Sequence, residues 1–317
     1  MKKYLIFSAI YFLLSTISLN GEDGYKLWLR YELVTDEQLL SDYRKQITGY
    51  IVCGTSPVMQ AASEEMSIAL HSMLGKEVPE LSKITRRGSV IAGTPSNSEL
   101  IKSLGLEKEL EVAGNEGYVV KSVRYRNKRL IIIAANEDAG VMYGVFHFLR
   151  LLQTHRDISA LNISSFPKTK LRLLNHWDNL NRSVERGYAG LSLWNWESLP
   201  DSIDPRYKDY ARANASTGIN GSVLTNVNAN ALILTEEYLQ KVAAIAGVLR
   251  PYNIKVYLTA RFSAPIEIGK LRSADPLDPE VGEWWKKKAD EIYKVIPDFG
   301  GFLVKANSEG QPGPQNY

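Results

Sequence analysis

The sequence predicts an α/β protein: a small N-terminal α/β (α+β) domain followed by the first half of a (β/α)8 TIM barrel. Three observations predict this fold. Short apolar segments alternate with helical patterns along the chain, their rhythm changes near residue 160, and each strand-like segment beyond that point ends in polar residues. Parallel α/β folds carry their ligands and catalytic groups at those strand ends.

The composition is that of an ordinary soluble globular protein with more than one domain. The 317 residues exceed one average domain, and 44% are hydrophobic and 23% charged. The net charge of +3, with no run of Lys and Arg, gives no reason to expect a nucleic-acid partner. The single cysteine, Cys53, cannot form an intramolecular disulfide and is interpreted as a small buried residue on a strand.

The N-terminal segment predicts a secretory signal peptide over residues 1–21. Two lysines precede an apolar run from Tyr4 to about Leu19, and small and polar residues follow. This pattern is typical of an exported bacterial protein, periplasmic or extracellular, with no stable membrane association after cleavage. The run is short for a membrane span of about 20 residues, although an uncleaved anchor is the alternative.

Residues 22–160 are expected to form the small N-terminal domain. The patterns predict strands at "YKLWLRYEL" (25–33), "GYIVCG" and "SVIAGTP", a helix from Pro57 to Gly75, a hairpin around residues 126–128 and a helix in "NEDAGVMYGVFHFLRLLQ". No phosphate-binding GxxxxGK[ST] motif is present. His71 and His147 lie in helical patterns without metal-ligand spacing and are interpreted as structural or exposed. This domain therefore offers no chemistry.

Residues 161–317 are expected to form a partial (β/α)8 domain with four strands. The strand-like segments are "LRLLNHWDN", "INGSVLTNVNAN", "YNIKVYLTARFSAP" and "GGFLVKANSEG", with helical segments between them; Asp278 caps the last helix and Pro279 takes its first position. A doubly wound sheet would need a Gly-rich first turn, which is missing. A whole barrel takes about 250 residues. Only about 150 follow Pro167, so the chain is interpreted as a fragment with half a barrel.

The polar strand ends indicate a carbohydrate site. Side chains alternate along a strand, so Leu303, Lys305, Asn307 and Glu309 share one face, opposite the apolar face of Phe302. A simple ion pair between Lys and Glu is the competing interpretation. The neighbouring ends "NHWDN" and "TNVNAN" offer Trp and Asn, which suit sugars, because the ring stacks on a C–H face and the amide both donates and accepts. A lysine among them would pair with a sugar carboxylate.

Several long segments resemble the α-glucuronidases of glycoside hydrolase family 67. They are "LLNHWDNLNRSVERGYAGLSLWNW", "YARANASTGINGSVLTNVNAN", "SADPLDPEVGEWW" and "IPDFGGFLVKANSEGQPGP". The resemblance begins at "GYKLWLRY" and covers nearly all of the chain after the signal peptide. Because these runs occur in the same order, the resemblance is far more specific than any short motif in the chain.

The resemblance implies inverting hydrolysis of the α-1,2 bond between (4-O-methyl)glucuronic acid and the terminal xylose of glucuronoxylan-derived xylo-oligosaccharides. It implies no cofactor and no metal, and it allows a homodimer of the full-length family member. It also implies Glu309 as the general acid, Lys305 as a ligand of the uronate carboxylate, Trp177 and Val227 as the pocket around the 4-O-methyl group, and Asn228 and Asp178 as further substrate-binding residues.

The chain departs from the family pattern in one large respect. The water-activating carboxylates and an arginine that binds the uronate belong to later strands, and an inverting glycosidase needs a second carboxylate about 6.5–9.5 Å from the acid. The isolated chain is therefore expected to be inactive. Two alternatives are a non-catalytic binding protein for uronates or xylo-oligosaccharides, and another exported barrel glycosidase such as a β-hexosaminidase relative. The lack of paired acids in the fourth strand counts against the latter.

Overall fold

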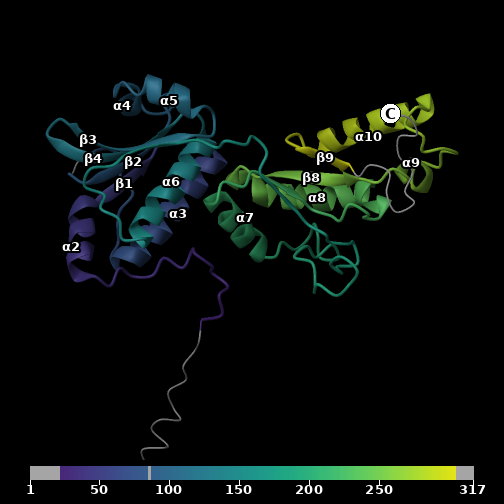
Figure 1. The fold of residues 1–317 in the computed structure, drawn as a ribbon, viewed down its shortest axis with the longest axis horizontal. Helices are drawn as coiled ribbons and strands as arrows, with labels where there is room; N and C mark the ends of the chain where they lie inside the picture. The colour runs from purple at the N-terminus through teal and green to yellow at the C-terminus, as the bar shows by residue number, and fades with distance from the viewer. Residues whose placement is uncertain (1–21, 85–86, 305–317) are drawn as a thin grey trace, which may run out of the picture. The chain divides into compact units, whose positions relative to one another are not determined.

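A computed structural model describes residues 22–84 and 87–304, and Figure 1 shows its fold. Within these residues the strands form two sheets, of order β1-β2-β4-β3-β5 and β6-β7-β8-β9. The strands are β1 (Gly49–Val52), β2 (Ser89–Gly93), β3 (Tyr118–Tyr125), β4 (Lys128–Ala135), β5 (Asn162–Ser165), β6 (Leu173–Asn175), β7 (Gly221–Val223), β8 (Lys255–Ala260) and β9 (Gly301–Val304). The helices are α2 (Glu37–Gln46), α3 (Pro57–Leu74), α4 (Glu99–Lys102), α5 (Glu107–Ala113), α6 (Asp138–Gln153), α7 (Arg206–Ser216), α8 (Glu236–Leu249), α9 (Ala264–Glu267) and α10 (Pro279–Val295), with 3-10 turns η1 (Ala231–Leu234) and η2 (Arg250–Tyr252).

The first sheet belongs to the predicted N-terminal domain and is mixed. Strands β1, β2 and β4 run parallel, whereas β3 is antiparallel to both β4 and β5. Helices α3 and α6 cover one face and the short helices α4 and α5 the other (Figure 1). Arg126 and Asn127 join β3 to β4 with φ angles of 45° and 61°. Because a two-residue turn with both φ angles positive matches the twist of paired strands, the predicted hairpin is confirmed.

Helix α3 begins and ends where the sequence predicts. The Ser56 side chain accepts a hydrogen bond from the backbone N–H of Met59, and Pro57 occupies the first helical position. Gly75 ends the helix in the left-handed conformation, with φ of 58°. These local signals fix the helix independently of its packing.

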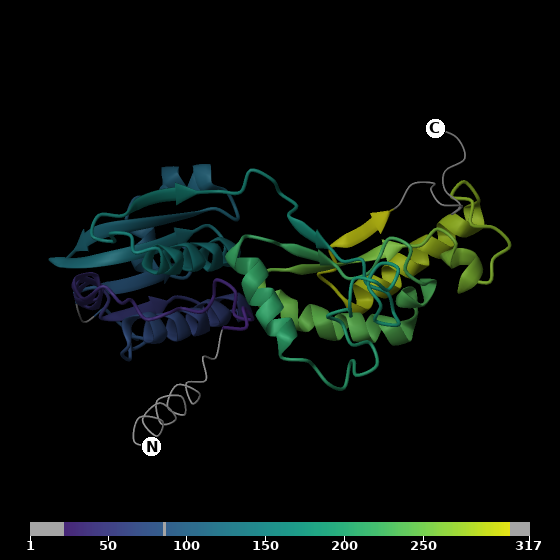
Figure 2. The same ribbon diagram turned by 60° about the horizontal axis from the view of Figure 1, so that its bottom comes forward.

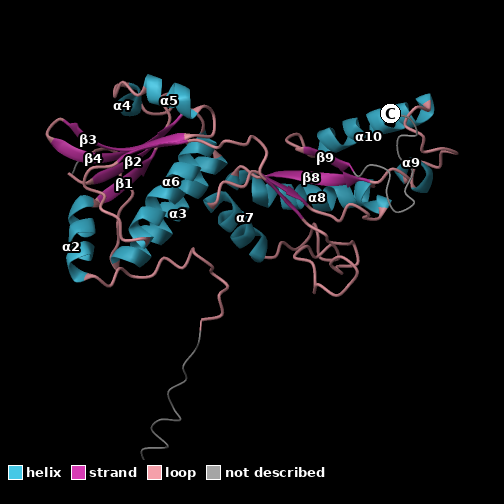
Figure 3. Ribbon diagram, viewed as in Figure 1, coloured by secondary structure: helices cyan, strands magenta, loops and turns pink. Residues whose placement is uncertain are grey.

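The second sheet is parallel throughout and alternates with helices, as half a (β/α)8 barrel requires (Figure 3). Asp278 caps α10 by accepting from the N–H of Glu280, and Pro279 opens that helix. Phe302 of β9 lies edge-on to Trp285 of α10, with ring centroids 6.0 Å apart. The predicted fold class is therefore confirmed, and Phe302 packs against a helix as the alternation predicts.

Two segments differ from expectation. The predicted strand at 25–33 is wrong, because residues 24–28 form turns and no strand follows before α2. Leu27 and Tyr31 have φ angles of 50° and 51°, which interrupt an extended backbone whatever the hydropathy pattern. Residues 22–30 form a unit of their own and are described only by their internal turns, such as the bond from Leu27 N to Gly24 O. Strand β5 carries the first sheet past residue 160, because its backbone pairs with β3.

Glu116 contacts the N-terminal ends of three neighbouring strands of the second sheet, which Figure 2 shows from another side. Its carboxylate accepts from Arg172 Nη2 at 2.9 Å, from Asn220 Nδ2 at 3.2 Å and from Asn253 Nδ2 at 3.3 Å. Arg172 and Asn220 directly precede β6 and β7, and Asn253 lies two residues before β8. Because the N-terminal face of a barrel serves stability and the opposite face serves chemistry, this contact stabilises the half barrel.

Within the described ranges, no helix has the length and apolar character needed to cross a membrane. The predicted signal peptide, residues 1–21, lies outside the described residues.

Candidate functional site

The carboxyl edge of the second sheet holds most of the predicted site residues. Strands β6 to β9 are parallel, so the segments that follow them leave the sheet at one edge. Trp177 and Asp178 follow β6, whereas Val227 and Asn228 follow β7. The site is therefore built from strand-end loops on a parallel sheet.

Trp177 presents an aromatic side chain to solvent at this edge. It is 47% exposed, whereas Trp194 and Trp196 nearby in the sequence are buried, with exposed fractions of 0% and 1%. An exposed indole at the carboxyl edge of a parallel sheet has the geometry needed to stack on the C–H face of a sugar. The predicted stacking role agrees with this exposure and stays a prediction.

Asn226 joins the two segments that carry these residues. Its backbone N–H donates to the carbonyl of Asp178 at 2.8 Å, and its side-chain amide donates to the carbonyl of Trp177 at 3.4 Å. Its Oδ1 also accepts from the N–H of Asn228 at 2.9 Å. One buried amide thus holds the segment after β6 against the segment after β7. Asn226 stands out in the sequence only as one of three asparagines in "TNVNAN", and its linking role could not be distinguished there.

Asp178 belongs to a buried network of polar side chains. Its side chain is only 6% exposed; one oxygen accepts from the Ser192 hydroxyl, and the other lies 3.6 Å from Nδ1 of His176. His176 Nε2 pairs with the Tyr210 hydroxyl at 2.8 Å, and Tyr210 in turn pairs with Ser222 at 2.8 Å. Such networks fix their members relative to one another. Asp178 therefore holds the strand-end loop in place, and its predicted contact with substrate stays a prediction.

Burial raises the pKa of Tyr210, the tyrosine in this network of side chains. It raises the pKa of the Tyr210 hydroxyl to about 12, and the negative charge of Asp178 adds to the rise, although the hydrogen bond with Ser222 opposes it. Tyr210 therefore stays protonated at neutral pH and can share its proton with either His176 or Ser222. The tyrosine acts as a fixed link between β6, α7 and β7.

Arg261 fixes the loop that carries Val227 and Asn228, and the sequence analysis did not single it out. Its Nη1 donates to the carbonyl of Asn228 at 3.0 Å, and its Nε lies 2.6 Å from Glu267. Burial alone would raise the pKa of Glu267, but hydrogen bonds from Ser263 and Arg261 outweigh it and lower the pKa. Val227 is half-buried and Asn228 is exposed. The sequence does contain a clue to Arg261, because this cation directly follows the third strand-like segment, in "YLTAR".

Lys305 and Glu309, the predicted uronate ligand and general acid, lie outside the described residues. The described part ends with Val304 of β9, so the predicted acid–lysine motif follows the fourth strand directly. Within residues 22–84 and 87–304, no three His, Cys, Asp or Glu side chains come together in a way that could hold a metal ion.

Comparison with known families gives two matches that together span most of the chain. Residues 27–148 match the family described as glycosyl hydrolase family 67 N-terminus. Residues 151–317 match glycosyl hydrolase family 67 middle domain. The order of the two matches follows the order of the two sheets.

The chain also resembles curated proteins that are named alpha-glucuronidases. The chain is 35% identical over 308 residues to the "Probable alpha-glucuronidase A" of Aspergillus oryzae, covering 96% of this chain and 36% of that protein. It is 33% identical over 326 residues to the "Alpha-glucuronidase A" of Emericella nidulans, covering 100% of this chain and 37% of the relative. The chain therefore spans little more than a third of the length of these relatives.

Solved structures share the fold at low sequence identity. A family GH115 4-O-methyl-alpha-glucuronidase with specificity for decorated arabinogalactans has a TM-score of 0.56 at 15% identity, covering 85% of this chain and 37% of that one. A GH138 enzyme targeting pectin rhamnogalacturonan II has a TM-score of 0.53 at 18% identity, covering 80% and 30%. These likenesses show the fold alone. The two family matches and the long alignments at about 35% identity establish that this chain belongs to glycoside hydrolase family 67.

Proposed function

We propose that this chain forms the N-terminal domain and first half of the catalytic barrel of an α-glucuronidase acting on xylan fragments. The enzyme would hydrolyse, with inversion, the α-1,2 bond that links (4-O-methyl)glucuronic acid to the terminal xylose of xylo-oligosaccharides. The observation that carries the proposal is the exposed Trp177, which stands at the catalytic edge of a parallel sheet in a chain of this family.

The described residues supply a wall of the sugar site. The indole of Trp177 would stack on the sugar ring, and the half-buried Val227 would contact the 4-O-methyl group. Asn228 is exposed on the same loop, where its amide can reach a hydroxyl. Asp178 would act mainly through position, because its carboxylate is buried against His176 and Ser192.

The chemistry would be carried by the motif after β9. Glu309 would protonate the leaving xylose oxygen, since an alkoxide leaves poorly without a proton. Lys305 would pair with the uronate carboxylate and so select an acidic sugar. Inversion also needs a carboxylate about 6.5–9.5 Å from the acid to activate water. We propose that residues beyond the first four strands provide it, as the greater length of the relatives allows.

The test compares two substrates in the longest protein that the source genome encodes around these residues. Glu309→Ala should abolish most release of glucuronic acid from aldouronic oligosaccharides. It should cost much less on a glucuronide with an acidic phenol as leaving group, because that group departs without a proton. Equal losses on both substrates would exclude Glu309 as the acid. Binding of glucuronate without any hydrolysis would favour the non-catalytic alternative.

Lys305→Ala in the same protein should weaken transition-state binding by about 2–5 kcal/mol, if its pair with the uronate is desolvated. The measurement is kcat/KM on the aldouronic substrate, with Lys294→Ala in α10 as the matched control. Unchanged activity of Lys305→Ala would remove this lysine from the site.

Export and assembly complete the proposal. Signal cleavage should fall near residues 20–22, where the apolar run ends, and N-terminal sequencing of the exported protein tests it. A mature protein that still begins at Met1 would indicate an anchor instead. Light scattering of the full-length protein tests the homodimer that the family resemblance allows.

A further inference from the structure

Basic side chains from two segments of the chain gather at one end of the first sheet. The hairpin between β3 and β4 and the segment before β2 supply them, and we call them the hairpin patch: Lys83, Arg87, Arg124, Arg126, Lys128 and Arg129. Resting on the function proposed above for the choice of polymer, we propose that the hairpin patch is a binding surface for an acidic polysaccharide. It would attach the enzyme to glucuronoxylan through the uronic acid side chains of the polymer.

Strand pairing brings the two basic segments together. The Lys128 ammonium donates to the carbonyl of Ile84, 44 positions away, at 3.1 Å. The N–H of Gly88 donates to the carbonyl of Arg129 at 2.9 Å, which places Arg87 beside the start of β4. Figure 1 shows this hairpin at the end of the sheet. The sequence spreads the cations over two short segments, and the fold assembles them into one patch.

The cations of the hairpin patch reach solvent and keep their charge. Five of the six are exposed, and Lys128 is half-buried. Within residues 22–84 and 87–304, none of the six forms an ion pair with an acidic side chain. Asp157 is an acidic neighbour of Arg129: hydrogen bonds from Ser159 and, more weakly, the charge of Arg129 hold the pKa of the Asp157 carboxyl below its usual value. The patch therefore presents a strong excess of positive charge.

Two arginines of the patch face each other across the hairpin. Arg124 on β3 and Arg129 on β4 occupy directly paired positions. Like charges at such positions repel and destabilise a sheet. Arg126 adds a third charge in the turn, where its guanidinium lies over the ring of Tyr125, 5.2 Å from the ring centroid. A destabilising arrangement at exposed positions indicates a role in binding rather than in folding.

The chemistry of the patch suits a polymer that carries carboxylates. Four of its six cations are arginines, whose planar guanidinium pairs with a carboxylate through two parallel hydrogen bonds. Each exposed pair contributes little by itself. Glucuronoxylan repeats its carboxylates along a neutral backbone, so one polymer chain can engage several arginines at once and gain affinity from their number.

The surroundings of the cations favour a polysaccharide over nucleic acid or a lipid surface. Single-stranded nucleic acid stacks its bases on exposed aromatic rings. The aromatic residue of the hairpin, Tyr125, instead packs against the core of the small domain. A basic surface that lies on a membrane inserts apolar side chains. The apolar residue beside Lys83, Ile84, packs against the same core. The patch thus offers charges without rings or apolar side chains for stacking or insertion.

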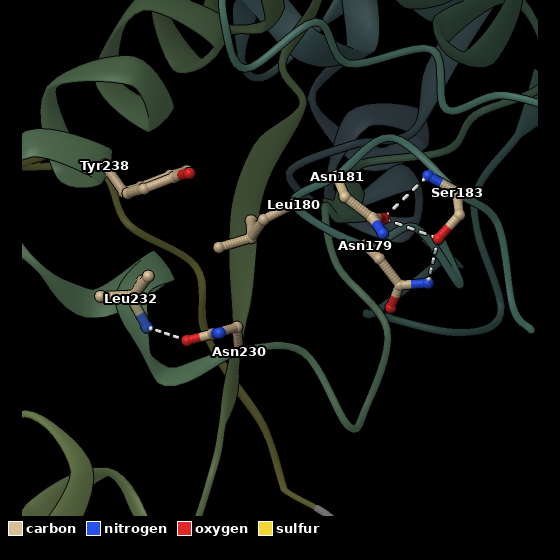
Figure 4. Close-up of a pocket in the computed structure, with 7 residues that line it drawn as sticks. All are labelled: Asn179, Leu180, Asn181, Ser183, Asn230, Leu232 and Tyr238. Atoms are coloured by element: carbon tan, nitrogen blue, oxygen red, sulfur yellow. Dashed lines mark hydrogen bonds between the residues drawn. The ribbon is translucent and has the colours of Figure 1, made fainter.

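The hairpin patch is separate from the candidate site. That site is built at the carboxyl edge of the second sheet, whereas the patch belongs to the first sheet. The cavity among the strand-end loops of the second sheet, shown in Figure 4, has no charged side chain among its described lining residues. It offers no cation to the acidic groups of a polymer, and the hairpin patch supplies several.

The test measures binding to immobilised glucuronoxylan by biolayer interferometry, using the longest protein that the source genome encodes around these residues. The hairpin variant, Arg124→Gln/Arg126→Gln/Arg129→Gln, removes three charges of the patch. A second variant changes the same three arginines to lysine, which keeps the charge and loses the planar fork. Thermal unfolding checks the fold of both variants. Because Arg124 and Arg129 repel each other, the hairpin variant should unfold at no lower temperature than the unchanged protein.

Two controls separate the patch from charge in general and from the sugar backbone. Lys286→Gln/Lys287→Gln/Lys294→Gln removes three charges from exposed positions of α10 and is the matched variant. Glucuronoxylan whose carboxyls have been reduced to alcohols is the matched polymer, because it keeps the sugars and loses the charges.

Salt sets the size of the expected effect. At about 10 mM salt the Debye length is about 30 Å, and each cation near an anionic surface contributes about fivefold to affinity. We therefore expect the hairpin variant to bind glucuronoxylan about ten- to hundredfold more weakly than the unchanged protein. The lysine variant should retain most of the affinity, and the α10 variant all of it. Raising the salt to about 100 mM should weaken binding of the unchanged protein, since the Debye length falls to about 10 Å.

Equal affinities of the hairpin and α10 variants would overturn the inference, as would equally tight binding of the reduced polymer. Capture of single-stranded DNA or of phosphatidylglycerol vesicles through the patch, without binding of glucuronoxylan, would also overturn it. The hairpin variant should hydrolyse short aldouronic oligosaccharides with unchanged kcat/KM. Failure of the hydrolysis test with intact polymer binding would overturn only the proposed function. Hydrolysis of short substrates by a protein that does not bind glucuronoxylan would overturn only this inference.

Discussion

Removing the positive charge of Arg212 should destabilise the chain strongly. The Arg212 guanidinium on α7 makes a two-pronged bond with Glu65 on α3, from Nε at 2.8 Å and from Nη2 at 3.0 Å. The Tyr31 hydroxyl donates to the same carboxylate at 2.6 Å. The Glu65 side chain is 2% exposed and that of Arg212 17%, so neither charge can be rehydrated in place. This network joins the small domain to the half barrel.

The structure sets the size of the effect. Arg212→Met removes the cation and leaves a buried carboxylate with only the Tyr31 hydroxyl, which costs about 3–5 kcal/mol of unfolding free energy. Tyr31→Phe removes a single hydrogen bond to a charged group and should cost about 1.5–3 kcal/mol. The double variant Glu65→Leu/Arg212→Met removes both charges, so it should be much more stable than Arg212→Met alone.

Urea denaturation followed by circular dichroism measures these differences, provided that the transition is two-state. Lys208→Met is the matched control. Lys208 pairs with Glu64 on the same two helices, but both side chains are more than half exposed, at 53% and 56%. Exposed pairs contribute about 0–1 kcal/mol. A cost below about 1 kcal/mol for Arg212→Met, or a double variant as unstable as the single one, would refute the reasoning.

Two further predictions concern pH and the contact at the strand starts. Burial, with a smaller effect from Arg150, lowers the pKa of His147, whose ring pairs with the Tyr118 hydroxyl at 2.8 Å. The unfolded chain then binds a proton first, so stability should fall as pH drops below about 6.5, and His147→Gln should flatten the unfolding free energy measured between pH 5 and 7. An unchanged pH slope would contradict this. Glu116→Gln should cost about 1.5–3 kcal/mol in urea denaturation, because it weakens the bond from Arg172. A cost under about 0.5 kcal/mol would show that the contact does not stabilise the half barrel.

Local chemistry explains which elements could be predicted. The hairpin at Arg126 and Asn127 and the caps at Ser56 and Asp278 depend on neighbours only a few residues away. The failed prediction at 25–33 has the same origin. Alternating hydropathy indicates a strand only when the backbone can extend and pair, and the positive φ angle of Leu27 prevents this.

Some features of the candidate site could likewise be predicted from the sequence, and others could not. Its predicted location at the strand ends follows from the alternation of strands and helices in the sequence, and the exposed indole of Trp177 agrees with the role predicted for it. The role of Asp178 was harder to predict, because a carboxylate directly after the exposed Trp177 looks available for substrate. Its carboxylate contacts Ser192, 14 positions along the chain, as well as the neighbouring His176, and only the fold brings Ser192 to it. Lys305 and Glu309 remain predictions from sequence.

The sequence by itself determined the family, the α/β class and the order of the four parallel strands, and it predicted the edge of the sheet at which the site lies. These properties follow from periodicity, capping and long segments that resemble the family in the same order, and none of them requires knowledge of distant contacts. Only the tertiary structure decided that Glu65 pairs with Arg212, 147 positions away, and that Glu116 reaches the starts of three strands. Such pairings depend on how whole helices and strands pack, so the residues next to a side chain in the sequence do not indicate which distant partner it will contact.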